Sequence, residues 1–314
     1  QHGPAAPAQH GPAAPEVAPM PWPPGPLSPR NASYTMDVVF SPDDHLVSGR
    51  QVLRWTNITE HATQELRYHL YYNAWRNDRS SFLRRAREQG KSFADVPADG
   101  WAYVDVHELR LRDPSGGEGI DLRATAEYIA PDDGNPDDRT VLRVPLPRAV
   151  EPGQTIEVEL RFSSKLPRTF ARTGFRGDYA FVAQWFPKLG VLEPDGQWAC
   201  HQLIQTEFFS DFGVYDVTIA APSDWVVGAT GREVETHDEY GIVLHRFVQE
   251  DVHDFAFAAW KGFREITATH GGVSDAACVG GCGKRCACAA WTDHLHRTNA
   301  GRRCEVEARC RSGR

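Results

Sequence analysis

YTMDVVF, residues 34–40, decides the fold class, because the apolar side chains of Tyr34, Met36, Val38 and Phe40 recur at every second position. Successive side chains of a β-strand point to opposite faces, so this spacing puts the apolar set on one buried face. The same rhythm returns in six further segments: QVLRWTNIT (51–59), AYVDVHELRL (102–111), TIEVELRF (155–162), YDVTIAA (215–221), DWVVGAT (224–230) and GIVLHRFV (241–248). Turn-forming clusters such as SPDDH, DPSGGEG, PDDGNPDD and EPGQ separate them. The sequence therefore predicts an all-β body.

One helix is expected to interrupt the strands, at SSFLRRAREQG, residues 80–90. Ser80 can cap its start by accepting a hydrogen bond from a backbone N–H of the first turn. Gly90 can end it, since glycine adopts the left-handed conformation that follows many helices. We expect this helix to decorate a loop of the β-body.

Composition excludes two classes of function. With a formal net charge of -8, the chain has no basic field for holding phosphates, so nucleic acid is not an expected partner. Its longest apolar stretches fall far short of the roughly 20 residues that a membrane-spanning helix needs, so no transmembrane segment is expected. At 314 residues and 41% hydrophobic content, the chain is long and apolar enough to bury a substantial core.

The two ends of the chain differ from this body. Residues 1–30 hold QHGPAAPA, then QHGPAAP and a Pro-rich run, a composition that favours extended polyproline conformations over packing. We expect this segment to be a disordered leader or linker. The first residue is Gln1 and not Met, which suggests that a signal peptide was removed and that the chain is exported to the periplasm or the extracellular space.

Residues 271–314 form the other unusual end, because they hold six of the seven cysteines and lack a sustained apolar period. Cys278, Cys282, Cys286 and Cys288 could supply thiolates to a tetrahedral zinc site. Their spacing is C-x3-C-x3-C-x-C and not the C-x2-C pairs of a zinc knuckle, and an exported chain would tend to oxidise them. We therefore interpret this segment as an irregular, aberrant tail, best explained by a frameshift, with zinc binding as the alternative.

AQWFPKLGVLEPDGQW (183–198), followed by QTEFFSDFGVYDV (205–217), resembles the N-terminal domain of bacterial aminopeptidase N-like zinc metallopeptidases, the gluzincin type. LRYHLYYNAWRND (66–78) and DVHDFAFAAW (251–260) are similar to other parts of the same domain, in the family's order. The resemblance covers roughly residues 34–269. It implies a large, curved, saddle-like sheet domain over residues 31–270.

The resemblance also implies a chemistry, the zinc-assisted hydrolysis of N-terminal residues from peptides. In the relatives, an H-E-x-x-H helix and a downstream Glu bind the zinc ion, and a G-x-M-E-N segment binds the substrate amino group. Neither motif occurs in this sequence. The nearest string begins at His107 and Glu108, has Leu111 where the second ligand belongs, and lies in alternating β-type sequence. The chain is therefore expected to be non-catalytic and to need no zinc, with the missing catalytic domain as its natural docking partner.

The family's N-terminal domain lends one polar side chain to the pocket for the substrate amino group, from a loop just before the aromatic-Pro step. Here that loop is GDYAFVAQWFP, residues 177–187. Asp178 is a substrate-binding candidate by spacing and Gln184 by chemistry, although the family's Gln or Glu followed by Arg is not reproduced. The alternative is that both only make hydrogen bonds within the loop.

The motif EFFSDFGVYDV carries an expectation of its own. Its aromatic residues, Phe208, Phe209, Phe212 and Tyr215, can anchor a loop into the core, while Gly213 permits a backbone approach that a Cβ would hinder.

Three functions therefore stay open from the sequence. The first is a truncated relative of the zinc aminopeptidases that has no catalytic module. The second is a stand-alone β-domain that binds peptides or proteins, and the third is a protein with a zinc-binding, Cys-rich tail.

Overall fold

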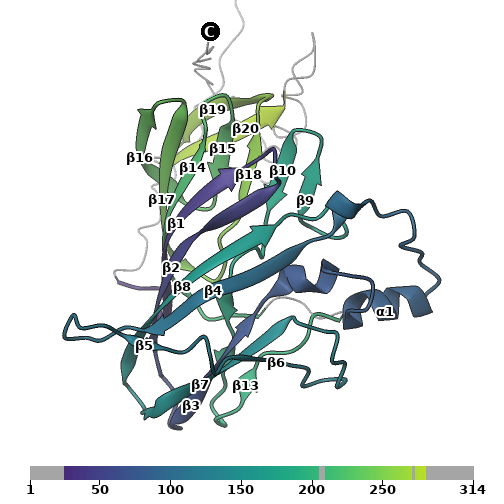
Figure 1. The fold of residues 1–314 in the computed structure, drawn as a ribbon. Helices are drawn as coiled ribbons and strands as arrows, with labels where there is room; N and C mark the ends of the chain where they lie inside the picture. Colours follow the sequence, from purple (N-terminus) through teal and green to yellow (C-terminus); the bar gives the residue numbers. More distant parts are fainter. Residues whose placement is uncertain (1–24, 205–208, 271–272, 281–314) are drawn as a thin grey trace, which may run out of the picture.

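The computed structural model describes residues 25–204, 209–270 and 273–280. The all-β prediction is confirmed, because strands dominate and only short helices interrupt them (Figure 1). The largest sheet has eight strands in the order β16-β17-β14-β1-β2-β8-β4-β5. Their bounds are β1 Ala32–Ser41, β2 Leu46–Thr56, β4 Tyr103–Leu111, β5 Ile120–Asp121, β8 Thr155–Lys165, β14 Gly213–Pro222, β16 Arg232–Glu239 and β17 Ile242–Val252.

Four smaller sheets complete the described strands. One has the order β15-β18-β10-β9, with bounds Val226–Ala229, Phe257–Trp260, Tyr179–Val182 and Gly174–Arg176. The next has the order β11-β3-β7-β6, with bounds Lys188–Leu189, Thr63–His69, Val141–Val150 and Glu127–Ile129. Two pairs remain: β12 Val191–Leu192 with β13 Trp198–Ala199, and β19 Phe263–His270 with β20 Val273–Gly280.

The strand β1 shows why the alternating pattern gave the right fold. Tyr34, Met36, Val38 and Phe40 are all buried, whereas Thr35 and Asp37 between them are exposed. β1 pairs antiparallel with β2 and parallel with β14, which places Tyr34 beside Tyr215. The apolar set of each strand thus faces one common core.

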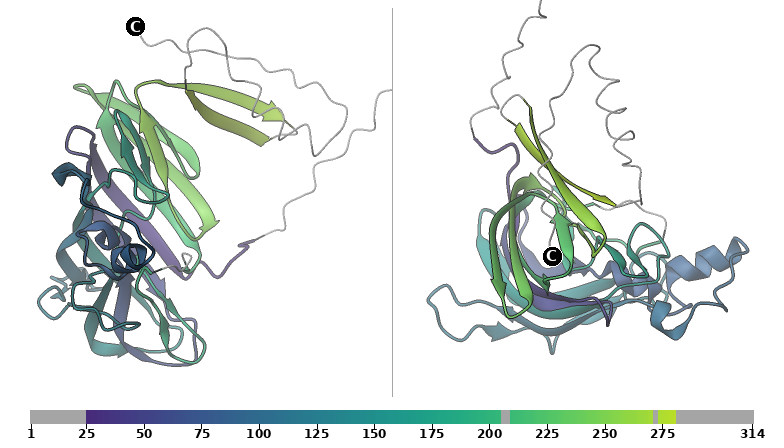
Figure 2. Two further views of the ribbon diagram at one scale, coloured as in Figure 1. Left: turned by 90° about the vertical axis from the view of Figure 1, so that its right-hand side faces the viewer. Right: turned by 90° about the horizontal axis from the view of Figure 1, so that it is seen from above.

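The large sheet curves, and the smaller elements lie against its buried face (Figure 2). The ring of Phe40 on β1 lies 5.8 Å from that of Phe257 on β18, and the ring of Tyr34 lies 5.4 Å from that of Phe186. The opposite face is solvated and carries cross-strand ion pairs, such as Arg50 with Glu159 at 2.7 Å. One face is therefore apolar and the other charged, as expected for a sheet half-covered by protein.

Three short helices connect the strands: η1 Tyr71–Trp75, α1 Ser81–Glu88 and η2 Ala98–Gly100. The predicted helix is α1. As expected, the Ser80 side chain accepts a hydrogen bond from the Leu83 N–H at 3.3 Å, and Gly90 after its end has φ +84°. Within the described ranges, no helix is both long and apolar enough to cross a bilayer.

The structure differs from the expected irregular tail in one respect. Residues 273–280 form β20, which pairs antiparallel with β19 from Phe263↔Gly280 to His270↔Val273. A two-stranded ribbon needs backbone pairing but no apolar alternation, so the periodicity argument did not detect it. Cys278 lies on β20, whereas Cys282, Cys286 and Cys288 lie outside the described residues.

Candidate functional site

The two predicted substrate-binding residues lie at opposite ends of β10 and do not form one site. They are six positions apart in the chain, so an extended backbone places them about 20 Å apart. Asp178 sits in the exposed turn before β10, where its Oδ1 accepts a hydrogen bond from the Trp260 indole N–H at 3.0 Å. Gln184 lies just beyond the other end of the strand, on the loop that leads to Trp185 and Pro187.

Gln184 combines two features that are rare together. Its backbone has φ +54°, in the left-handed region that a residue with a Cβ seldom adopts. Its side chain is buried, with 9% of the residue exposed, and its Oε1 atom has no hydrogen-bond partner. A strained backbone and an unpaired buried acceptor both cost free energy, so the surrounding structure must hold this residue in place.

Thr173 holds the chain immediately before Gln184. Its hydroxyl accepts a hydrogen bond from the Ala183 N–H at 3.1 Å and donates one to the Phe181 carbonyl at 3.0 Å. The Tyr72 hydroxyl lies 2.8 Å from the same oxygen. One Thr hydroxyl thus has its full set of one donated and two accepted hydrogen bonds, all at the entrance to the loop.

Buried side chains hold the rest of the loop in the same way. The Ser164 hydroxyl donates to the Trp185 carbonyl, and the Gln51 amide donates to the Pro187 carbonyl at 2.9 Å. The Trp185 indole N–H donates to the Phe255 carbonyl at 3.1 Å. Sequence reasoning missed Ser164 and Gln51 because each comes from a distant strand, and it named Trp185 only as part of a motif without its contact to the Phe255 carbonyl.

Lys188 is the most unusual of the residues that anchor this loop. It is 1% exposed, yet its Nζ lies 2.6 Å from Asp254 Oδ1 and donates to the His253 carbonyl at 3.0 Å. Burial lowers the pKa of this ammonium group, while the Asp254 carboxylate opposes that shift. The sequence could have indicated this ion pair, because a lysine within the apolar run WFPKLGV is either exposed or paired with an acidic group.

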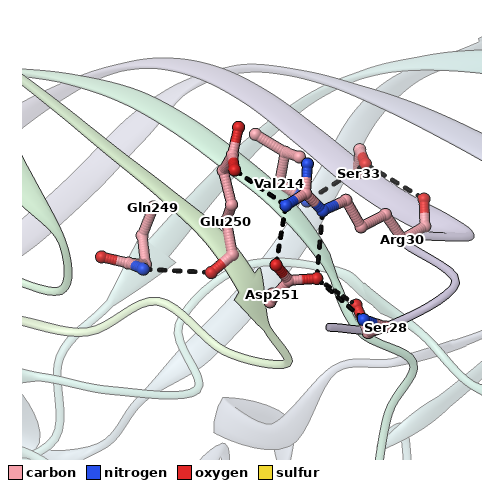
Figure 3. Close-up of polar contacts among 7 residues, drawn as sticks. All are labelled: Ser28, Arg30, Ser33, Val214, Gln249, Glu250 and Asp251. Carbon is pink, nitrogen blue, oxygen red and sulfur yellow. Dashed lines mark hydrogen bonds and ion pairs between the residues drawn. The ribbon is translucent and has the colours of Figure 1, made fainter. Parts of the chain in front are cut away.

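The corner formed by residues 250–255 contacts this loop through the His253 carbonyl and contacts the start of the domain through Asp251, whose contacts with Ser28 and Arg30 are drawn in Figure 3. The Arg30 guanidinium donates two hydrogen bonds to the Asp251 carboxylate, at 3.0 and 2.7 Å, and one to Glu250 at 2.8 Å. The Ser28 hydroxyl donates to the same Asp251 at 2.7 Å. The hydrogen bonds from Arg30 and Ser28 hold the pKa of the Asp251 carboxyl well below its usual range.

The aromatic motif is only partly buried, which corrects the prediction that its aromatic residues anchor a loop in the core. Tyr215 is buried, and its hydroxyl donates to the His253 carbonyl at 3.2 Å. Phe209 and Phe212 are 52% and 44% exposed, and Phe208 lies outside the described residues. Residues 213, 215 and 217 of β14 face the core. Because side chains alternate along a strand, Phe212 lies on the side that faces outward.

Asp211, next to these aromatic residues, gives a pH-dependent prediction. Burial raises the pKa of its carboxyl from 3.8 to about 6, while a hydrogen bond with Asn31 opposes the shift and the charge of Glu193 adds to it. Between these two pH values the folded chain binds a proton that the unfolded chain has lost, so the contribution of Asp211 to stability falls as the pH rises. Asp211→Asn should therefore stabilise the fold at pH 7 by up to about 3 kcal/mol and have little effect at pH 4. Urea unfolding at the two pH values measures this, and equal effects at both would contradict it.

The described residues do not fit a zinc ion. His107 and Glu108 lie on strand β4, where the His107 Nε2 atom contacts the Ser163 hydroxyl at 2.8 Å. Across residues 25–204, 209–270 and 273–280, no group of three or more His, Cys, Asp or Glu side chains could hold a metal ion. The candidate site is therefore a hydrogen-bonded loop with one unpaired acceptor, Gln184 Oε1.

Comparison with known proteins gives the following findings. No family model matches the sequence, and no curated protein matches it. The solved structures similar to it include an M1 zinc metallopeptidase from Deinococcus radiodurans, at 13% identity and a TM-score of 0.45, covering 77% of this chain and 45% of that one. A mutant of that metallopeptidase bound to a Tyr-Ser-Ala substrate is similar at 14% identity and a TM-score of 0.49, covering 86% and 53%. The chain thus spans about half the length of these structures.

Proposed function

We propose that this chain is the N-terminal β-domain of an aminopeptidase N-like zinc metallopeptidase, is non-catalytic by itself, and uses Gln184 to bind the amino group of a peptide. The observation that carries this proposal is the buried Gln184 Oε1 atom without a hydrogen-bond partner. It lies directly before the WFP step, where the sequence resemblance puts a side chain that contacts the substrate amino group. A carbonyl oxygen is a suitable acceptor for an α-ammonium group, and because this oxygen is buried the Gln184 side chain has to turn outward to meet one.

The backbone of Gln184 supports the same proposal. Glycine adopts φ +54° without steric cost, whereas a residue with a Cβ loses roughly 1 kcal/mol there. The hydrogen bonds from Thr173, Ser164 and Gln51 impose this conformation. The presence of glutamine at this position is then explained by what its side chain binds.

Two measurements test this explanation, one on the variant Gln184→Gly and one on the wild-type chain. The variant should raise the free energy of unfolding by about 1 kcal/mol, because the strain and the unpaired acceptor both disappear. In NMR titrations of the wild-type chain, a tripeptide with a free α-amino group should shift the side-chain amide resonance of Gln184, and its N-acetylated form should not. If the acetylated peptide gives the same shifts, or Gln184→Gly destabilises the fold, the proposed role of Gln184 is wrong.

The proposed lack of catalysis has its own test. The purified chain, supplied with zinc, should hydrolyse aminoacyl-nitroanilides no faster than the buffer blank, because it lacks the three protein ligands that lower the pKa of a bound water to about 7. A zinc-dependent turnover that a chelator abolishes would contradict this proposal.

A stand-alone peptide-binding domain is the second candidate function. It is favoured by the hydrogen bonds that Thr173, Gln51 and Trp185 make at this loop, which support its conformation within this domain. The nucleotide sequence around codon 270 separates the two: a shifted frame that encodes H-E-x-x-H would support the truncated peptidase and its missing catalytic domain as partner. An exported location stays part of the proposal under either function.

A further inference from the structure

The hairpin of β16 and β17 extends the large sheet at its far edge (Figure 1). All eight residues of β16 are exposed. The strand pairs with β17 from Arg232↔Val248 to Glu239↔Ile242, and the described part of the chain places no strand along its other side. The opposite end of the sheet is β5, which has only two residues. β16 is therefore the one long free edge of this sheet among the described strands, and its outer backbone N–H and C=O groups can pair with another chain.

The charge of this edge is strongly negative. β16 carries four carboxylates, Glu233, Glu235, Asp238 and Glu239, and one guanidinium, Arg232. The side chains of Glu235 and Glu239 are 67% and 61% exposed. Their residues pair with Arg246 and Ile242 on one face of the sheet, whereas Asp238 pairs with Val243 on the other. A strand added here would meet carboxylates on both faces.

Neighbouring basic side chains offset only part of this charge, since the His245 Nδ1 atom lies 2.6 Å from Glu233 Oε1 and the His237 Nε2 atom lies 4.0 Å from Glu239 Oε2. Arg246 directs its guanidinium to Asp216, with hydrogen bonds of 2.9 and 2.8 Å, and lies 3.7 Å from Glu235. A second copy of the same acidic strand would be repelled, because like charges directly opposite each other destabilise strand pairing. The charges thus disfavour self-association and leave the edge free for a strand of opposite charge.

The tip of the hairpin adds a feature that favours a cation. Tyr240 is 98% exposed and has φ +51°, next to Gly241 at φ +85°, in the two-residue turn that joins the strands. Asn, Asp or Gly usually occupies such a position. The ring of Tyr240 contributes nothing to the core, whereas an exposed aromatic face binds a Lys or Arg side chain.

We propose that β16 receives an extended, Lys- or Arg-rich segment of another protein as an added β-strand. Backbone hydrogen bonds to the free edge hold the segment, its cations pair with the β16 carboxylates, and Tyr240 stacks on a cation at the end. This proposal does not rest on the peptidase resemblance, since it uses none of the residues around Gln184.

The test uses the full chain and three capped ten-residue peptides. The first alternates Lys and Thr, the second has Glu in place of Lys, and the third is the Lys peptide with its central backbone amides N-methylated. Hydrogen exchange of residues 232–239 should slow by about tenfold or more with the Lys peptide and stay unchanged with the other two. Because the pairing is electrostatic at an exposed site, binding should also weaken as salt rises.

Variants of exposed residues complete the test without affecting the core. Glu235→Gln and Glu239→Gln should each weaken binding by up to about fivefold. Glu118→Gln is the matched control, since its side chain is 90% exposed and lies near the opposite end of the sheet. If the N-methylated peptide binds as tightly as the unmodified Lys peptide, the attraction is electrostatic only and strand addition is wrong. Failure of the Lys peptide to bind, or protection elsewhere than on β16, would overturn the proposal.

Discussion

Replacing Lys188 with alanine should lower the free energy of unfolding by about 3 to 5 kcal/mol, the range observed when one partner of a buried ion pair is removed. The Lys188 ammonium has only 1% of its side chain exposed and lies 2.6 Å from Asp254, whose side chain is 21% exposed. Without Lys188, the partly buried Asp254 carboxylate loses its cation and keeps the hydrogen bond from the Phe255 N–H at 2.8 Å, and the His253 carbonyl loses a donor. Neighbouring His69 does not replace the charge, because burial alone lowers the pKa of its imidazole.

The matched control is the double variant Lys188→Met with Asp254→Asn. It removes both charges while it keeps side chains of similar volume, so it should recover much of the loss. Urea unfolding of the single and double variants measures the coupling between the two residues. A loss below about 1 kcal/mol for Lys188→Ala would mean that the pair does not hold the loop. Hydrogen exchange should also quicken at residues 184–189 before the rest of the domain.

Most of the strands that the sequence predicted bury one face. The residues of β1, β2, β4, β8 and β14 alternate because each strand lies between core and solvent over several residues. The predicted segments that became β15 and β17 differ, since each of these two strands contains only one buried residue. The helix α1 was predictable for a local reason, since Ser80 and Gly90 act through their own backbone neighbours. Such signals need no knowledge of the tertiary fold.

The loop around Gln184 could not be predicted in this way. The adjoining strands β11, β12 and β13 have two residues each, which is too short for any period to appear. Its supports, such as Gln51 and Asp254, come from distant segments that only the folded chain brings together. The sequence named Gln184 as a candidate through family resemblance, but its left-handed backbone and its unpaired oxygen follow from tertiary contacts alone.

Gly213 was singled out by the sequence motif, and the tertiary contacts explain why a glycine is needed there. A Cβ at this position would lie 1.8 Å from the Ala32 carbonyl oxygen and 2.5 Å from its carbon. Both are backbone atoms at the start of β1, so no side chain can move aside, as the sequence motif had indicated. Gly213→Ala should therefore push β1 and β14 apart where their parallel pairing begins and lower the free energy of unfolding by about 3 kcal/mol.

Gly117→Ala is the control for this variant, because its nearest neighbour, at 2.5 Å, is the Asp113 carboxylate, which can rotate into solvent. It should change stability by less than about 1 kcal/mol. In Gly213→Ala, the loss should appear first as faster hydrogen exchange at Ala32 and Val214, because the Ala32 N–H donates to the Phe212 carbonyl at 3.3 Å and the Val214 N–H donates to Ser33 at 3.1 Å. If both alanine variants are equally stable, the close approach of Ala32 does not require a glycine at position 213, and the presence of glycine in the FGVYDV motif needs another explanation.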